Sequence, residues 1–303
     1  MAPTDTLALP VRPPLLRAAA VIVVAGLLMV ATVVARGFDP PWFEHAYLIV
    51  LENHGSASIV GNPQAPYLNG LIASYGLATD YTAVAHPSQP DYLALVSGST
   101  WDVQDDASHD LSGQTLFDQI EQHGRTWHVY EQDYPGGCFT GAQASGPVDL
   151  VGLPGAYVRK HDPAISFTSI SGSRARCANI TSLASFDAGA ADFEMIVPNL
   201  ANDMHDGSIR QGDEFLAAFV PRILSSAAFA HGALFITWDE GTGSANGGGR
   251  VPMIVVRPGM TPGFRSYATH THRAFPRTVE DAWGLGCLPQ TCHVTDLGQF
   301  FGR

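Results

Sequence analysis

One serine of this chain lies between two prolines, in the stretch His86-Pro-Ser-Gln-Pro-Asp-Tyr92. Proline fixes its own φ and biases the preceding residue toward an extended conformation, so the backbone around Ser88 should be stiff. A stiff backbone presents the hydroxyl in one direction, which a nucleophile needs, whereas a simple turn more often uses glycine or asparagine. The alternative interpretation is a rigid polar loop. Ser88 is therefore a candidate nucleophile that needs partners from elsewhere in the chain.

Two pairs of oxygen-bearing side chains each follow an apolar run of strand length. The pairs are Glu52 with Asn53 and Asp239 with Glu240. Neighbouring carboxylates at a buried strand end repel one another and raise each other's pKa unless a cation is present. Taken singly, each pair is better explained as a solvated turn. The two pairs together with Ser88 favour a metal site instead.

The predicted metal site has oxygen donors only. Its ligands would be Glu52, Asn53, Asp239, Glu240 and the Ser88 hydroxyl. Oxygen-only ligands suit hard cations, which favours Ca²⁺, Mg²⁺ or Mn²⁺. A Zn²⁺ site would need more histidine, which His205 and His272 could supply.

The elements that must position these groups alternate between strands and helices. Continuous apolar runs predict buried strands, and amphipathic or glycine-terminated segments predict helices. The predicted strands span 46–51, 126–130, 193–198, 233–237 and 251–256, and the predicted helices span 65–75, 92–96, 115–123, 212–226 and 275–283. This alternation predicts an α/β fold with a mostly parallel central sheet and helices on both faces. Sites in such sheets collect at the carboxyl ends of the strands, an edge that the Ser88 stretch can also reach.

Residues 131–192 interrupt the alternation. Glycine, proline, serine and aspartate are dense in this region, and two of the cysteines lie in it. Such composition predicts a loop-rich, cap-like insertion and no regular strand–helix unit. The insertion would belong to one folded domain that spans residues 44–303.

The N-terminal region has a different character. Residues 18–35 carry no charge, and residues 1–17 form a tail that contains Arg12 and Arg17. The apolar run is short for a membrane-spanning helix and long for the core of a signal peptide. We favour a transmembrane signal anchor over a cleaved signal peptide, with the N-terminus in the cytoplasm. Either segment would place the rest of the chain outside the cytoplasm, membrane-anchored or secreted.

The cysteines agree with export. An even number, four, occurs in the chain, and disulfides are typical of exported proteins. Cys287 with Cys292 could close a small loop, and Cys138 with Cys177 a longer one, although three connectivities are open. No CxxC spacing occurs, which makes a zinc site on these cysteines the weaker interpretation.

Composition limits the partners. The chain of 303 residues has a formal net charge of −12 and no cluster of lysine and arginine, which argues against nucleic acid. Its 46% of hydrophobic residues suffices for a large core. Nothing in the sequence indicates a protein partner.

Several further motifs occur in a fixed order along the chain. They are Leu51-Glu-Asn53, Ala65-Pro-Tyr-Leu-Asn69, the Ser88 stretch with Ser97-Gly98, Tyr157 with Lys160-His-Asp-Pro163, Pro198-Asn-Leu200 with Asp203-Met-His-Asp206, Trp238-Asp-Glu-Gly241, and His272 with Arg277-Thr-Val-Glu-Asp281 and Gly284-Leu285. Together they resemble the bacterial phosphoesterase family, which includes acid phosphatases and non-haemolytic phospholipases C. The resemblance covers about residues 45–286 and implies an alkaline-phosphatase-like fold.

The resemblance implies roles for individual residues. Ser88 would be the nucleophile, and the five oxygen donors named above would hold the metal. His205 and His272 match histidines that line the phosphate pocket and would take part in catalysis. His161 matches a further family histidine and would contact the substrate.

Two residues beside the nucleophile, His86 and Asp91, are also expected to contact the substrate. Asp91 departs from the family pattern, which commonly has asparagine there. A further negative charge near a phosphate is unfavourable unless it is paired or points away. The chain is also shorter than the phospholipase members, which favours a small phosphomonoester as substrate.

The expected reaction is metal-dependent hydrolysis of a small phosphate ester through a phosphoserine intermediate, as in an acid phosphatase. One alternative is a phosphodiesterase or phospholipase C, because the N-terminal segment would bring the site to a lipid surface. An alternative of another class is a surface-anchored binding protein with a degenerate site. The presence of all five proposed ligands argues against it.

Overall fold

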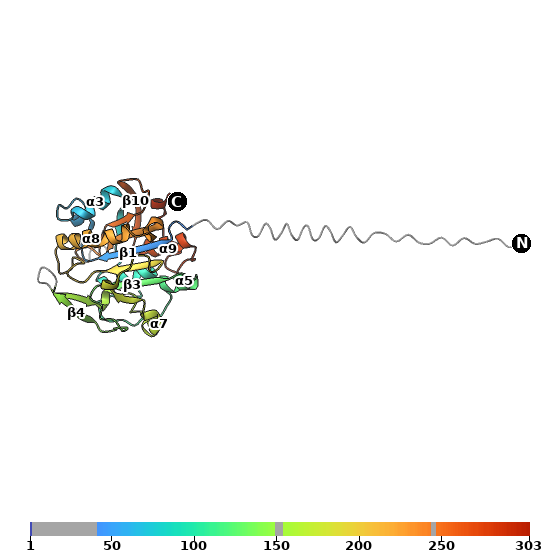
Figure 1. Ribbon diagram of the computed structural model, residues 1–303, viewed down its shortest axis with the longest axis horizontal. Helices are drawn as coiled ribbons and strands as arrows, with labels where there is room; N and C mark the ends of the chain where they lie inside the picture. Colours follow the sequence, from blue (N-terminus) through green and yellow to red (C-terminus); the bar gives the residue numbers. More distant parts are fainter. Residues whose placement is uncertain (2–40, 149–153, 244–246) are drawn as a thin grey trace. The chain divides into compact units, whose positions relative to one another are not determined.

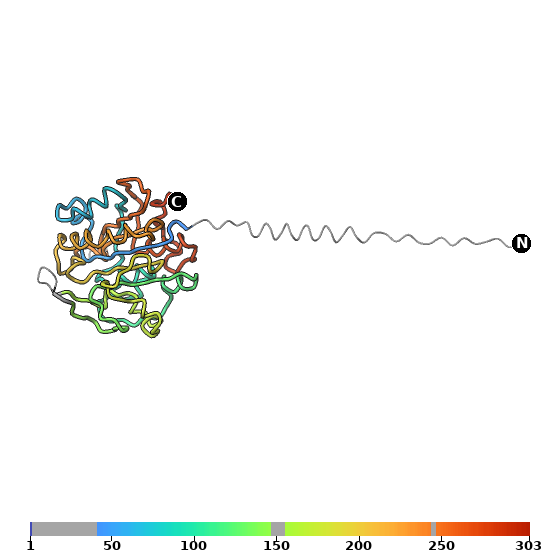
Figure 2. Tube along the Cα trace, in the orientation of Figure 1, coloured from blue at the N-terminus to red at the C-terminus, as the bar shows by residue number. Residues whose placement is uncertain are grey.

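A computed structural model describes the chain except for residues 2–40, 149–153 and 244–246 (Figures 1 and 2). The predicted tail at 1–17 and the predicted membrane segment at 18–35 fall almost entirely outside the described residues. Among the residues that are described, no helix is long and apolar enough to cross a membrane. Residues 41–303 form one compact unit.

A mixed, mostly parallel sheet forms the centre of this unit. Its strands are, in spatial order, β10 (Phe264–Thr271), β2 (Gly76–Thr82), β9 (Met253–Val256), β8 (Gly232–Trp238), β1 (His45–Leu51), β7 (Phe193–Val197), β3 (Trp127–Glu131) and β6 (Ile180–Ser182). Strand β9 runs antiparallel to both of its neighbours, and every other adjacent pair is parallel. The predicted fold class is therefore confirmed.

The central strands are buried on both faces, as their apolar runs predict. All residues of β8 are buried, and so are all residues of β1 except His45. In the register, Ile49 of β1 lies between Ile196 of β7 and Ile236 of β8. Parallel strands with neighbours on both sides and helices above and below leave no solvated face, so alternation of polar and apolar residues is absent.

Helices flank the sheet (Figure 1). They are α2 (Ser56–Ile59), α3 (Pro66–Ser74), α4 (Ser88–Ser97), α5 (Leu116–Gln122), α6 (Thr168–Ser171), α7 (Arg174–Cys177), α8 (Ile209–Leu224) and α9 (Ala274–Trp283). Helix α3 packs against α8, and α4 packs against α5 and α9. Asp118 and Thr115 form a reciprocal capping box at the start of α5, where the sequence predicts a helix.

Outside residues 131–192, two strands were not predicted from the sequence, β2 and β10. They pair with each other in parallel on the side of the sheet that ends at β10. Both strands mix buried and accessible residues without regular alternation, and β10 carries the exposed Tyr267 within a register shift. A continuous apolar run is therefore not the right signal for either strand.

Residues 131–192 are more regular than their composition suggests. Strands β4 (Gln143–Val148) and β5 (Pro154–Val158) form an antiparallel pair of their own, beyond β3 in Figure 1. Strand β6 joins the central sheet as its edge strand beside β3. A short 3₁₀ helix, η1 (Arg159–His161), follows β5 and contacts α4.

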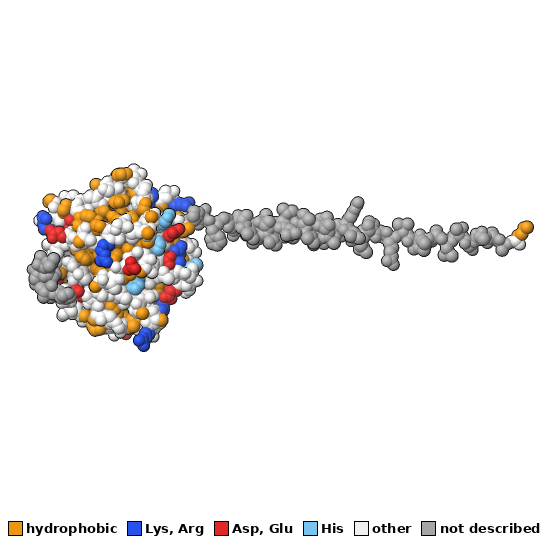
Figure 3. Space-filling view, viewed as in Figure 1, with side chains coloured by type: hydrophobic (Ala, Val, Ile, Leu, Met, Phe, Trp, Pro, Cys, Tyr) orange, Lys and Arg blue, Asp and Glu red, His pale blue; other side chains and the backbone are white. Residues whose placement is uncertain are grey.

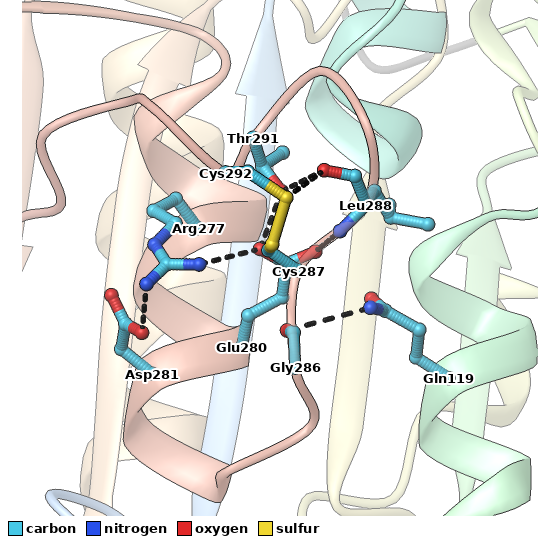
Figure 4. Close-up of a disulfide and its surroundings, with 9 residues drawn as sticks. All are labelled: Gln119, Arg277, Glu280, Asp281, Gly286, Cys287, Leu288, Thr291 and Cys292. Atoms are coloured by element: carbon cyan, nitrogen blue, oxygen red, sulfur yellow. Dashed lines mark hydrogen bonds and ion pairs between the residues drawn. A yellow bond between two sulfur atoms is a disulfide. The ribbon is translucent and has the colours of Figure 1, made fainter.

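The four cysteines form two disulfides, Cys138–Cys177 and Cys287–Cys292. This is one of the three connectivities that the sequence left open. Figure 4 shows how the smaller loop is held on α9. The Glu280 carboxylate accepts hydrogen bonds from the Leu288 N–H at 2.7 Å and from the Thr291 hydroxyl at 2.6 Å. One buried carboxylate thus organises the backbone that the disulfide closes.

Candidate active site

Ser88 is the first residue of helix α4. The prediction of a loop at this position, with a helix from residue 92, is therefore wrong in its boundary, and α4 begins four residues earlier. The cause is local, because Pro87 and Pro90 suit the N-cap and first turn, where a missing N–H is tolerated. A helix N-terminus carries a partial positive charge that favours an anion close to it. The Ser88 hydroxyl is thus placed where a developing alkoxide or a phosphate oxygen is stabilised.

Three carboxylates lie at the carboxyl ends of adjacent strands, and one of them accepts the Ser88 hydroxyl. Glu52 follows β1, Asp239 follows β8 and Asp203 follows β7 after a short turn. The backbone links these ends, since the Glu52 N–H donates to the Asp203 carbonyl and the Asp239 N–H donates to the Leu51 carbonyl, at 2.8 and 2.9 Å. The Ser88 hydroxyl donates to Oε2 of Glu52 at 3.2 Å. The parallel sheet therefore brings the predicted groups together.

Asn53, the partner of Glu52 in the first predicted pair, contacts two of these acids. Its backbone N–H donates to Oδ1 of Asp239 at 2.9 Å, and its side-chain amide donates to Oε2 of Glu52 at 3.4 Å. Asn53 has a positive φ of 50°, a conformation that asparagine tolerates better than most residues. This turn aligns the backbone of Asn53 with the acid of the neighbouring strand.

The carboxylates are buried, and burial shapes their protonation. Glu52, Asp203 and Asp239 are all fully inaccessible to solvent. Loss of hydration raises the pKa of each, and in Glu52 the charges of Asp239 and Asp203 raise it further. Burial also raises the pKa of Glu240 to about 7. Groups so placed favour either protons or a cation among them.

His161 of η1 completes a compact set of donors with Glu52 and Asp203. Their ligand atoms all lie within 4.8 Å of one another. The Nε2 atom of His161 is 3.1 Å from Oε1 of Glu52, and its Nδ1 atom is 3.7 Å from Oδ2 of Asp203. Its ring stacks on Tyr92, with centroids 4.9 Å apart. Burial and the nearby Lys160 charge lower the pKa of His161, which keeps the imidazole neutral and able to bind a metal.

The donor atoms fit a cation. Among the described residues, Oε1 of Glu52, Oδ2 of Asp203, Oδ2 of Asp239 and Nε2 of His161 are buried and make no hydrogen bond. Orphaned buried polar atoms are costly, and a bound metal ion would satisfy them together. Two overlapping donor sets share Glu52, one with Asn53, Ser88 and Asp239 and one with His161 and Asp203.

His86 and Glu240 form a pair at the edge of this cluster. The Nδ1 atom of His86 contacts Oε2 of Glu240, and the His86 side chain is less than half exposed. His86 is therefore positioned to orient Glu240.

Asp91 and His272 lie behind the cluster. Oδ1 of Asp91 accepts the backbone N–H groups of Val84 and Ala85 at 2.8 and 3.1 Å, so this carboxyl fixes the chain that leads to the nucleophile. Burial raises the pKa of Asp91 to about 9, which makes the group neutral near pH 7. The Nε2 atom of His272 contacts the Asp239 carbonyl, and its Nδ1 atom is 3.3 Å from the Tyr81 hydroxyl. Burial lowers the pKa of His272 to about 4. Both residues support the site from inside the protein.

His205 lies on the accessible side. Its side chain is 33% exposed, and its Nδ1 atom is 2.7 Å from Oδ1 of Asp206. Its ring centroid is 6.5 Å from that of His161. The backbone N–H of His205 donates to Oδ1 of Asp203, which ties the exposed imidazole to the buried acid. This imidazole can exchange protons with solvent.

Sequence reasoning left out three residues that the structure places here: Asp203, Tyr92 and Lys160. A signal for Asp203 existed, because it follows a buried strand just as Glu52 and Asp239 do. In the sequence, Tyr92 is expected only as the first residue of the helix at 92–96, and Lys160 belongs to a motif without an assigned role. The packing of η1 against α4 places both, because Tyr92 stacks on His161 and Lys160 pairs with Asp106, which accepts the Gln89 N–H.

The chain is similar to known phosphoesterases. Residues 58–286 match the model of the Phosphoesterase family. A phosphatidylinositol-3-phosphatase of Mycobacterium tuberculosis is 30% identical over 258 residues, which cover 84% of this chain and 81% of that protein. An acid phosphatase of Aspergillus fumigatus is 28% identical over 229 residues, 72% of this chain and 50% of the relative.

Solved structures with the same fold have little sequence in common with the chain. A protein of the alkaline phosphatase superfamily from Vibrio parahaemolyticus superposes with a TM-score of 0.57 at 10% identity, covering 86% of this chain and 71% of that one. The lipoteichoic acid synthase LtaP of Listeria monocytogenes gives a TM-score of 0.58 at 11% identity, covering 86% and 78%. These likenesses concern the fold alone.

Proposed function

Since this chain belongs to the Phosphoesterase family and is a phosphatase-type enzyme that hydrolyses phosphate esters, we propose that it cleaves phosphomonoesters through a phosphoserine intermediate on Ser88. The observation that carries the proposal is the position of Ser88. Its hydroxyl lies at the N-terminus of α4 and donates to Glu52, in a cluster of buried carboxylates.

The proposed reaction has two displacements. In the first, the Ser88 oxygen bonds to phosphorus, the ester bond breaks, and the alcohol leaves with a proton. In the second, water attacks phosphorus, phosphate leaves, and the Ser88 hydroxyl is restored. His205 is the imidazole that we expect to supply and recover the proton, because it exchanges with solvent.

A divalent cation would contribute charge neutralisation and a lower pKa for the Ser88 hydroxyl. The residues that would hold it are Glu52, Asn53, Asp239, Glu240 and Ser88, and His161 and Asp203 offer a second set of donors around Glu52. The mixed oxygen and nitrogen donors admit Mg²⁺, Mn²⁺, Ca²⁺ or Zn²⁺. Asp91 and His272 would act by holding the Ser88 turn and the Asp239 backbone in place.

Two kinds of phosphomonoester are candidate substrates. Small soluble monoesters agree with the acid phosphatase relatives. A phosphorylated lipid headgroup agrees with the relative named phosphatidylinositol-3-phosphatase, which is matched over most of both chains. An extracytoplasmic location, with the N-terminal segment as anchor or signal, is consistent with the two disulfides.

The test is hydrolysis by the full chain, with each divalent cation in turn. The substrates are nitrophenyl phosphate, a phosphoinositide monoester and a choline phosphodiester. Ser88→Ala should reduce kcat by at least about 10³-fold. Ser97→Ala is the matched control, because Ser97 is a buried serine at the other end of the same helix. Turnover of the diester alone, or a Ser88→Ala variant with normal turnover, would refute the proposal.

A further inference from the structure

Helix α4 takes its N-terminal hydrogen-bond acceptor from a distant loop. The N-cap residue, Pro87, provides no side-chain acceptor. The backbone N–H of Gln89, the residue after the nucleophile, donates instead to Oδ1 of Asp106 at 3.1 Å. The N–H groups of a first helical turn have no partner within the helix, so an anion from elsewhere satisfies them. In this structure the anion is a carboxylate of the protein itself.

The second oxygen of the same carboxylate meets a cation. Oδ2 of Asp106 accepts a hydrogen bond from Nζ of Lys160 at 2.9 Å, and the two side chains are 31% and 20% exposed. Burial opposes the charge of Lys160, but Asp106, Glu52 and Asp239 outweigh it and raise the pKa of Lys160. Asp106 therefore lies between a backbone donor of the nucleophile helix and an ammonium group that feels the charges of the buried acids.

The loop that carries Asp106 is attached to η1 beyond this contact. Arg159 donates to Oδ1 of Asp110 at 2.5 Å and to the carbonyl of His109 at 3.0 Å. These bonds fix the loop after Asp106, while the side chain of Asp106 is held, among the described residues, by the Gln89 N–H and Lys160. The carboxylate can therefore leave its two partners without a change in the rest of the loop.

A phosphate monoester offers the same chemistry as this carboxylate. Two of its oxygens can take one backbone N–H at a helix N-terminus and one ammonium group. A phosphate and a carboxylate cannot share these donors, because both are anions. We propose that Asp106 occupies, in the substrate-free enzyme, the place of the substrate phosphate, and that the substrate displaces it from the Gln89 N–H and from Lys160.

This inference rests on the proposed function and adds a residue that sets affinity. Asp106 competes with every phosphate that enters, so it weakens the binding of substrate and of the product phosphate alike. Lys160 becomes a phosphate-binding residue, and Asp106 a residue that lowers phosphate affinity because it occupies both Lys160 and the Gln89 N–H. A helix cap without this role would stabilise α4 and leave phosphate affinity unchanged.

The experiment measures inhibition of the full chain by inorganic phosphate, with nitrophenyl phosphate as substrate. Asp106→Ala should lower the inhibition constant for phosphate and KM by roughly 3–10-fold, the scale of a charge-assisted contact at a partly exposed site. The kcat value should stay level or fall, because product release slows. Lys160→Met should raise both constants, and more strongly in the Asp106→Ala background, where the ammonium has no internal partner.

Asp105→Ala is the matched control. Asp105 is the neighbouring acid, is 65% exposed and pairs with His109, so its removal deletes the same charge without freeing Gln89 or Lys160. Its phosphate inhibition constant should stay within about twofold of wild type, since a distant exposed charge is screened. A lower melting temperature for Asp106→Ala with an unchanged or raised inhibition constant would overturn the inference and leave Asp106 as a helix cap.

The two proposals fail in different ways. If the wild-type chain shows no turnover that depends on Ser88, the proposed function fails, and the role of Asp106 fails with it. If Ser88-dependent turnover is normal and Asp106→Ala does not bind phosphate more tightly, only the inference about Asp106 fails. Tighter phosphate binding in Asp106→Ala but not in Asp105→Ala supports both.

Discussion

Replacement of Glu52 by glutamine should stabilise the metal-free protein and remove its activity. Burial, and then the charges of Asp239 and Asp203, raise the pKa of Glu52. A carboxyl group with a raised pKa in the folded state contributes stability at low pH, and this contribution is lost as the pH rises above its ordinary value. Glutamine does not ionise, so the Glu52→Gln variant does not lose this stability as the pH rises. Its side-chain oxygen can still accept the Ser88 hydroxyl.

The size of the effect follows from the spacing of the acids. The ligand atoms of Glu52 and Asp203 are within 4.8 Å of each other. At an effective dielectric constant of about 20, two full charges at that separation repel by about 3 kcal/mol. Partial protonation reduces this, so about 1–2 kcal/mol of stabilisation is expected near pH 8. For a domain of this size that corresponds to a rise in melting temperature of roughly 2–8 °C.

The assay is scanning calorimetry in a chelator at pH 5 and pH 8. The control is Glu44→Gln, an exposed glutamate just before the same strand. The Glu52→Gln variant should melt above wild type at pH 8 and close to it at pH 5, whereas Glu44→Gln should follow wild type at both. A divalent cation should stabilise wild type more than Glu52→Gln. A Glu52→Gln variant that melts below wild type at pH 8 in chelator would refute the reasoning.

Two further predictions concern stability away from the site. Burial raises the pKa of Glu194 to about 7, so the fold favours its neutral form. As the pH rises from 4 to 8, the stability of wild type should therefore fall by up to about 3 kcal/mol relative to that of Glu194→Gln. Urea unfolding at several pH values measures this difference in stability, and a difference that does not change with pH would contradict the prediction. The second prediction is that each disulfide stabilises the fold by an amount that grows with the logarithm of the number of residues in the loop that it closes. The two disulfides separate their cysteines by 39 and 5 residues, so loss of Cys138–Cys177 should lower the free energy of unfolding by about 4 kcal/mol and loss of Cys287–Cys292 by about 2 kcal/mol. Urea titrations of the two double serine variants measure both values. A larger loss for Cys287–Cys292 would contradict an effect that depends on loop length.

Much of the fold could be predicted from the sequence, because the buried strands β1, β7 and β8 are continuous apolar runs. Strands β2 and β10 could not, since they are partly accessible and their residues carry no such run. The start of α4 is not predicted from the sequence, because Pro87 and Pro90 suit a loop as well as the first turn of a helix.

The candidate site divides in the same way. Residues that follow central strands, such as Glu52 and Asp239, could be found because parallel strands bring their carboxyl ends to one edge. Lys160 and Asp106 could not, since they meet only through the packing of η1 and a loop against α4. Asp91 looked unfavourable beside a phosphate, and the structure explains it, because it binds backbone N–H groups behind the nucleophile.

The stereochemical course at phosphorus tests the central claim most directly. The full chain would transfer a phosphoryl group made chiral with oxygen isotopes from a monoester to an acceptor alcohol, and the configuration of the product would be determined. Two in-line displacements, the first by Ser88, predict net retention. Inversion of configuration would mean a single displacement by the acceptor and would contradict a phosphoserine intermediate.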